Sequence, residues 1–177
     1  MPSIQRLEHV RDVFIFSCYT GLAYVDVEKL IEDDIVIGMD GRRWIKVNRT
    51  KTKTLSSIPI LPIAEQILSK YASLTKIDIK LLPVYSNQRT NGYLKEIADL
   101  SGITKKLTFH MARHTFATTV TLSNGVPIES VSKMLGHKSL KTTQHYAKIL
   151  DTKLSEDMKN LRIRFENETI LSNINRY

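Results

Sequence analysis

The sequence contains a single cysteine, Cys18, among 177 residues. One thiol cannot form an internal disulfide, so a small secreted fold held together by cross-links is excluded and a reducing compartment fits best. There is also no run of about 20 apolar residues, the length that a membrane-spanning helix needs. The first residues, MPSIQRLEHVRDVFIF, lack the basic, apolar and small-residue order of a secretory signal and indicate a helix instead. We therefore expect a cytoplasmic protein with no membrane partner.

Acidic residues are in the minority. The chain has 18 Asp and Glu against 26 Lys and Arg, which gives a net charge of +8. A basic chain is attracted to polyanions, most simply nucleic acid, although a merely soluble basic protein would have the same composition. The 42% hydrophobic and 25% charged residues are typical of one globular domain.

Hydrophobic periodicity predicts mostly helices and one small sheet. Apolar residues at helical spacing predict a helix over residues 4–18, a short helix after the TGL break and further helices from Pro62 onward, including one continuous helix over FHMARHTFATTVTLSNG. Between Ile35 and Ile60, the runs IVIG, RRWIKV and LSSIPI predict a three-stranded antiparallel sheet. A last helix over about 153–165 precedes a polar end. The predicted fold class is α+β, mostly α-helical.

Histidine and arginine occur together in the run HMARH. His110 and Arg113 are three residues apart, so on a helix they share a face and could bind a phosphate together. His114 would also allow a metal-binding pair with His110, but Met111 occupies the place of the glutamate in the HExxH pattern, so we expect no metal. Taken alone, HxxR is more often a salt-bridged or capped helix face.

The run GHKSLKTTQHYAKIL combines two histidines with a tyrosine. Gly136 ends a helix and leaves His137 at an exposed corner, and Thr142 or Thr143 is expected to cap the next helix. Tyr146 lies one turn into that helix. Taken alone, Tyr146 is more simply a core aromatic whose hydroxyl forms a hydrogen bond than a reactive group.

The run NRTKTKTLSSIPI carries three basic residues at alternate positions, Arg49, Lys51 and Lys53. These side chains share one side if the run is extended. A basic hairpin can reach into a DNA groove. The alternative is a solvated, lysine-rich edge that resists aggregation.

These features follow one another in an order that resembles a known family. The order is TGL with an acid six residues after its threonine, a lysine before IPI, HxxR, LGHKS, and a tyrosine nine residues after that histidine. It closely resembles the catalytic domain of the tyrosine recombinases, the phage-integrase-like site-specific DNA recombinases. The resemblance covers roughly residues 5–165, and HMARHTFAT and MLGHKSLKTTQHYAKI are its most specific parts.

The resemblance implies an enzyme that breaks and rejoins DNA strands. Tyr146 would be the nucleophile that forms a 3′-phosphotyrosine intermediate. Arg113 would hold the scissile phosphate, and His110 and His137 would supply further hydrogen bonds or proton transfer. Double-stranded recombination sites would be the partner, and no cofactor is implied. The protein would form a tetramer on DNA, with a monomer as the alternative without DNA, and would be associated with the nucleoid of a bacterium that carries a mobile element.

The resemblance also assigns the residues near the second strand, with one departure. Lys51 matches the hairpin lysine that would protonate the leaving 5′ oxygen, and Asp26 matches the acidic position that supports the site. The family's first arginine follows TGL directly, but Ala23 stands there. The enzyme is then slow, inactive, or served by another arginine. Arg49, two residues before Lys51, is the candidate substitute.

The resemblance implies a catalytic domain over residues 1–165 and a polar tail over residues 166–177, without the N-terminal core-binding domain that such integrases usually carry. Two other functions fit the same residues. A DNA-binding module that has lost catalysis is favoured by Ala23. A type IB topoisomerase shares the chemistry, but LGHKSLKTTQHY favours the recombinase.

Overall fold

The computed structural model describes most of the chain. The described residues are 2–72, 80–147, 155, 158–159, 161–163 and 165–166. The described residues between 155 and 166 are helical, whereas the other residues of the predicted C-terminal helix and almost all of the predicted polar tail lie outside the described residues. Across the described part of the chain, no helix is both long and apolar enough to cross a membrane.

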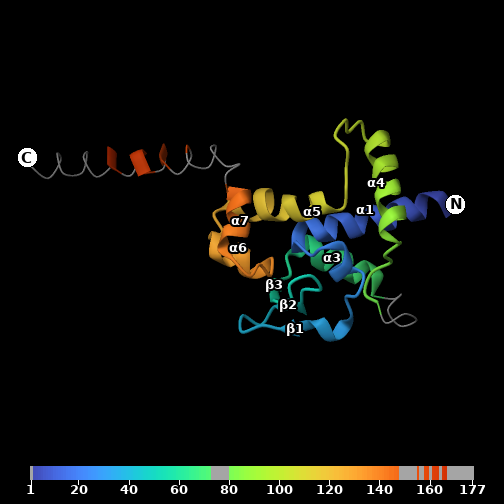
Figure 1. Cartoon of the computed structure of the whole chain (residues 1–177), viewed down its shortest axis with the longest axis horizontal. Helices are drawn as coiled ribbons and strands as arrows, with labels where there is room; N and C mark the ends of the chain where they lie inside the picture. The colour runs from blue at the N-terminus through green and yellow to red at the C-terminus, as the bar shows by residue number, and fades with distance from the viewer. Residues whose placement is uncertain are drawn as a thin grey trace, which may run out of the picture.

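Helices make up most of the fold, and α1 lies at its centre (Figure 1). The helical segments are, in chain order, α1 (Pro2–Thr20), α2 (Tyr24–Val27), η1 (Glu32–Asp34), α3 (Pro62–Tyr71), α4 (Asn87–Leu100), α5 (His110–Thr115), η2 (Phe116–Thr121), η3 (Leu122–Asn124), α6 (Ile128–Met134) and α7 (Leu140–Ala147). α1 contacts α3, α4 and α5, so side chains are buried on several of its sides, among them Val10, Val13 and Phe16. The predicted mixed fold with a helical majority is confirmed.

The predicted three-stranded sheet is also confirmed. β1 (Ile35–Ile37), β2 (Arg43–Asn48) and β3 (Leu55–Pro59) are antiparallel, and β2 lies in the middle. Ile45 pairs with Ile58 across β2 and β3, and both are buried, while Lys46 faces solvent. This alternation follows from the two-residue period of a strand. Because β3 contacts α6, the sheet is held close to the last helices.

Two helices differ from the prediction. Val25, Val27, Leu30 and Ile31 are spaced as the apolar set of one short helix after TGL, but that helix ends at Val27. Ile31 is extended and forms an antiparallel bridge with Lys80. The single long helix predicted after Phe109 is an α-helix followed by a π-helix and a 3-10 turn. In the π-helix the Thr121 hydroxyl donates to two backbone carbonyls, those of Phe116 and Ala117, at 2.9 and 2.8 Å. Such side-chain bonds compete with the regular backbone ladder.

The packing of α1 yields a first prediction. Replacing Phe16, which is 0% exposed, by alanine should lower the free energy of unfolding by about 3–5 kcal/mol, because the lost transfer energy adds to the cavity left behind. The matched control is Ile4→Ala on the same helix, where the side chain is 63% exposed and the change should be within about 0.5 kcal/mol. Urea unfolding followed by circular dichroism measures both, and equal midpoints would contradict the proposed core.

Candidate active site

Arg113 lies at the centre of the candidate site. It projects from α5 into the protein and is 3% exposed. Its two terminal nitrogens donate to the backbone carbonyls of Gly21 and Leu135, both at 2.5 Å. One of them also lies 3.1 Å from Nε2 of His137. Segments far apart in the sequence therefore meet at this one guanidinium.

His137 is not at an exposed corner, as its position after a helix end had indicated. It is half-buried between α5 and α7, with Nδ1 2.8 Å from the Thr143 hydroxyl. An arginine has no acceptor, so Nε2 of His137 must accept from Arg113, and the ring proton is on Nδ1 and is donated to Thr143. Neither predicted threonine caps α7, because both lie inside that helix. The side-chain oxygen of Ser139, just before it, accepts from the Lys141 amide at 3.3 Å.

Tyr146 joins this cluster from α7. Its ring lies parallel to that of His137, with centroids 6.2 Å apart and an angle of 4° between the planes, and it meets the His114 ring edge-on at 4.7 Å. Tyr146 is 8% exposed and belongs to the hydrophobic core. The two interpretations of this tyrosine are therefore compatible, because its ring packs on the core next to Arg113 and His137.

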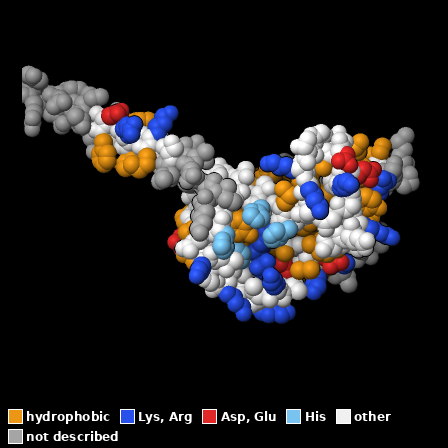
Figure 2. Space-filling model, turned by 45° about the horizontal axis from the view of Figure 1, so that its top comes forward, with side chains coloured by type: hydrophobic (Ala, Val, Ile, Leu, Met, Phe, Trp, Pro, Cys, Tyr) orange, Lys and Arg blue, Asp and Glu red, His pale blue; other side chains and the backbone are white. Residues whose placement is uncertain are grey.

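The site concentrates positive charge. Burial lowers the pKa of Arg113 to about 10, with the charge of Arg49 as the next cause. Burial, then Arg113 and Arg49, lowers the pKa of His137 to about 4. The pKa of His110 is lowered by burial first and by its cationic neighbours next. Both imidazoles are therefore neutral near pH 7, and a bound anion would relieve the repulsion. Figure 2 shows histidine side chains gathered beside Lys and Arg side chains on one face.

Arg49 reaches this site, although it does not lie on an extended strand beside Lys51 as predicted. Residues 49–54 form a turn rather than an extended strand, closed by bonds from the Arg49 amide to the Thr54 carbonyl at 3.0 Å and from the Lys53 amide to the Arg49 carbonyl at 2.8 Å. The shared-side argument is therefore wrong. The Arg49 side chain is nevertheless only 11% exposed, and its Nε lies 3.9 Å from Oδ2 of Asp26. That nitrogen is buried and has no hydrogen-bond partner in the described part of the chain.

Asp26 and Lys51 complete the predicted set. Asp26, 6% exposed in α2, accepts a hydrogen bond from the Thr50 amide at 2.9 Å and so fixes the start of the turn. Lys51 is exposed in that turn, and its charge contributes to the lowered pKa of His110, after the burial of that ring and the contributions of His114, Arg113 and Arg49. All the predicted site residues therefore lie in or around one region.

Ala23 lines a groove of about 380 Å³ together with Tyr24, Asn91, His110 and Arg113. Asn91 on α4 accepts a hydrogen bond from the Phe109 amide at 2.9 Å, which holds the start of α5. The position of the missing arginine thus borders the site, and the groove leaves room beside it.

The role of Gly136 is larger than that of the helix end that the sequence predicts. Its φ is 59°, a left-handed conformation that favours glycine. A Cβ there would lie 2.6 Å from the Ser56 hydroxyl and 3.3 Å from Cδ of Arg49. The absence of a side chain therefore lets the turn carrying Arg49 approach the corner before His137. The helix-end pattern was visible in the sequence, but the neighbour across the gap was not.

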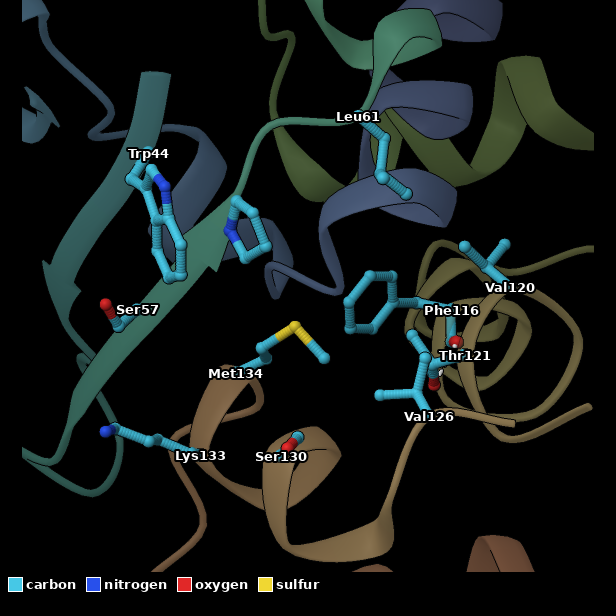
Figure 3. Close-up of a pocket in the computed structure, with 11 residues that line it drawn as sticks. Trp44, Ser57, Leu61, Phe116, Val120, Thr121, Val126, Ser130, Lys133 and Met134 are labelled. Carbon is cyan, nitrogen blue, oxygen red and sulfur yellow. Dashed lines mark hydrogen bonds between the residues drawn. The ribbon is translucent and has the colours of Figure 1, made fainter. Parts of the chain in front are cut away.

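A second hollow, of about 470 Å³, lies between the sheet, the π-helix and α6 (Figure 3). Trp44, Phe116, Val126 and Met134 are among its lining residues, so its wall is mostly apolar. It contains none of the predicted site residues. Within the described residues there is also no group of three or more His, Cys, Asp or Glu side chains that could hold a metal ion.

Residues 19–153 match the phage integrase family. The chain belongs to this family. It is similar to the tyrosine recombinase XerD of Listeria innocua, with 31% identity over 159 residues that cover 82% of this chain and 52% of that protein. It is also similar to the tyrosine recombinase XerC of Rickettsia massiliae, with 33% identity over 104 residues that cover 51% of this chain and 32% of that protein. The chain thus spans about half the length of XerD.

Solved structures share the fold. The crystal structure of XerA recombinase aligns with a TM-score of 0.67 and 23% identity over 88% of this chain and 63% of that one. A lambda integrase dimer bound to a COC′ core site aligns with a TM-score of 0.60 and 20% identity over 77% of this chain and 51% of that one. At such identities the likeness establishes the architecture, and the roles of individual residues depend on the site itself.

The charge balance of the site gives a prediction that needs no DNA. The pKa of His137, about 4 in the intact site, should rise toward its ordinary value of 6.5 in Arg49→Ala, because one of the charges that oppose its protonation is removed. Arg42→Ala, at an exposed position in the first hairpin, is the matched control and should leave it unchanged. Titration of the imidazole carbon-bound protons by NMR measures this. A pKa that is the same in both variants would place Arg49 outside the site.

Proposed function

We propose that this chain is the catalytic domain of a site-specific DNA recombinase, an integrase of a mobile element, which cuts double-stranded DNA with Tyr146 and rejoins it. Membership of the phage integrase family supports the general activity. The observation that carries the proposal is the cluster in which Arg113 contacts His137 at 3.1 Å while the His137 ring lies parallel to that of Tyr146. A buried arginine, a neutral imidazole and a phenol side by side suit attack on a phosphodiester.

The cleavage step follows from these groups. The Tyr146 hydroxyl oxygen attacks phosphorus, and a neutral imidazole of the site takes the phenol proton. The bond between phosphorus and the 5′ oxygen breaks, and the Lys51 ammonium gives that oxygen a proton. Phosphorus stays bound to the 3′ oxygen and to tyrosine, so the phosphoester is conserved. A 5′ hydroxyl from another strand then attacks the phosphotyrosine and releases Tyr146.

The charges around the phosphate stabilise the crowded, more negative transition state. Arg113 is fixed by two carbonyls before DNA arrives, so little reorganisation is needed. Arg49 supplies the second guanidinium, because Ala23 stands where the family has its first arginine. In support of that role, its Nε is buried, faces Asp26 at 3.9 Å and has no hydrogen-bond partner among the residues described. Asp26 then supports Arg49 and, through the Thr50 amide, the turn that carries Lys51.

The wider expectations remain part of the same proposal. Residues 1–165 act as the catalytic domain, the protein works as a tetramer on its recombination sites, and it acts in the bacterial cytoplasm on the nucleoid. The second candidate is a DNA-binding module without catalysis, which Ala23 favours. The two differ in one product, a covalent protein–DNA adduct.

Nicked suicide duplexes with a randomised central sequence test the proposal, because cleavage beside a nick releases a short strand and traps the adduct. The full chain should form an adduct that survives denaturation, and sequencing the trapped DNA identifies a usable site. Tyr146→Phe should abolish the adduct while the protein stays folded, since the ring that packs in the core is kept. Tyr93→Phe is the matched control and should react like the parent. The enzymatic proposal fails if no tyrosine-dependent adduct forms.

The role of Arg49 is tested on a nicked duplex that carries the site identified by this sequencing, which we call the captured duplex. Arg49→Ala should slow adduct formation by about 10²–10³-fold, the usual effect of removing one donor to a transition-state anion. Adding Ala23→Arg to that variant should restore part of the rate, because the groove beside Ala23 has room for the side chain. An Arg49→Ala protein that reacts at the parental rate would exclude the substitution.

A further inference from the structure

The turn that carries Lys51 is attached to the site on both sides of that lysine. On one side, the backbone amide of Thr50 donates to Asp26 at 2.9 Å. On the other side, the Thr52 hydroxyl donates to the backbone carbonyl of Gly136 at 3.0 Å. Lys51 is the only residue between these two attachments, and it is exposed.

The second attachment joins the turn to the corner that precedes His137. Gly136 adopts a φ of 59°, and its carbonyl accepts from a residue 84 positions away in the sequence. The close approach depends on the missing side chain of Gly136, since a Cβ there would overlap the Ser56 hydroxyl at 2.6 Å. The Thr52 hydroxyl therefore connects the lysine turn directly to the segment that holds the phosphate-side histidine.

A lysine that acts as a general acid needs such support. Its ammonium is a point charge on a flexible four-carbon chain, so the backbone beneath it decides where it can reach. A misplacement of about 1 Å can cost 10²-fold in rate. The backbone around Lys51 is itself unusual, because Lys53 has a φ of 57°, which few non-glycine residues adopt. Without the bond to Gly136, the part of the turn after Lys51 loses its hydrogen bond to the corner before His137.

We infer that Thr52 is a positioning residue that holds Lys51 where its ammonium protonates the leaving 5′ oxygen. The inference rests on the proposed function, in which Lys51 is that acid. It assigns to Thr52 a role in one proton transfer rather than in phosphate binding or in tyrosine attack. The loss of the hydroxyl should therefore be felt only when the leaving group needs a proton.

A sulfur-substituted substrate isolates that step. In ordinary DNA the bond between phosphorus and the 5′ oxygen breaks, and the alkoxide that forms is a strong base that takes the Lys51 proton. In a duplex whose 5′ bridging oxygen is replaced by sulfur, the bond between phosphorus and sulfur breaks, and the electron pair stays on sulfur as a thiolate. A thiol has a pKa of about 8.5, so the thiolate leaves without a proton.

The experiment compares adduct rates on the captured duplex, with oxygen or with sulfur at the 5′ bridge, for four variants of the full chain. Thr52→Val removes the hydroxyl at nearly constant volume, and Thr52→Ser keeps it. Thr54→Val makes the same change in the same turn, but that hydroxyl donates within the turn, to the Thr52 carbonyl at 3.4 Å. Lys51→Ala removes the acid itself. Thr52→Val should be slower by about 10–100-fold on oxygen and close to the parent on sulfur.

Thr52→Ser and Thr54→Val should resemble the parent on both substrates, and Lys51→Ala should show at least the substrate preference of Thr52→Val. If Thr52→Val is slowed equally on both substrates, Thr52 has only a structural role and the inference is wrong. If its rate on the oxygen substrate is unchanged, Thr52 has no role in positioning Lys51. If Lys51→Ala is selective and Thr52→Val is not, the inference alone is overturned. If Lys51→Ala shows no preference either, the assignment of Lys51 fails and the inference with it.

Discussion

The guanidinium of Arg113 holds the candidate site together, because it links the chain at three separate points. It bonds to the Gly21 carbonyl after α1, to the Leu135 carbonyl at the end of α6, and to His137 before α7. Burying this charge is costly unless its donors find partners, and here two backbone carbonyls and the His137 ring are such partners. The same contacts that satisfy the buried arginine also place a histidine and the helix of Tyr146 beside it. The fold and the site therefore depend on one residue.

The charges of the site are matched to a ligand that carries negative charge. Burial first, and then the charges of Arg113 and Arg49, lower the pKa of His137 and keep its imidazole neutral. Asp26, next to Arg49, offsets part of the positive charge. A phosphodiester would receive hydrogen bonds from the guanidiniums, and the neutral imidazole of His110 would be available for a proton. The alanine after TGL does not remove the second guanidinium from this region, because Arg49 enters it from the turn between β2 and β3. An arginine supplied from a different element can serve the same phosphate if its terminal nitrogens reach it.

Much of the fold and the membership of the family were predictable from the sequence, because they depend on periodic patterns and on local motifs. The alternation around Ile45 predicts the sheet, and HMARH followed by LGHKS and a tyrosine indicates the family. The turn at residues 49–54 was not predictable, since alternating Lys and Thr also suit an extended strand. The half-buried position of His137 and its bond to Thr143 depend on tertiary packing that no local pattern records. The change from α-helix to π-helix after Thr115 is likewise invisible, because both suit the same apolar spacing.

In the proposed reaction, Tyr146 becomes covalently linked to the 3′ phosphate of cleaved DNA. Its most direct test is tandem mass spectrometry of the protease-digested adduct, after nuclease has trimmed the DNA to a short remnant. We expect the nucleotide mass on Tyr146, with the phosphorus joined to the 3′ oxygen of the remnant. A remnant on any other residue, or one joined through a 5′ phosphate, would contradict it.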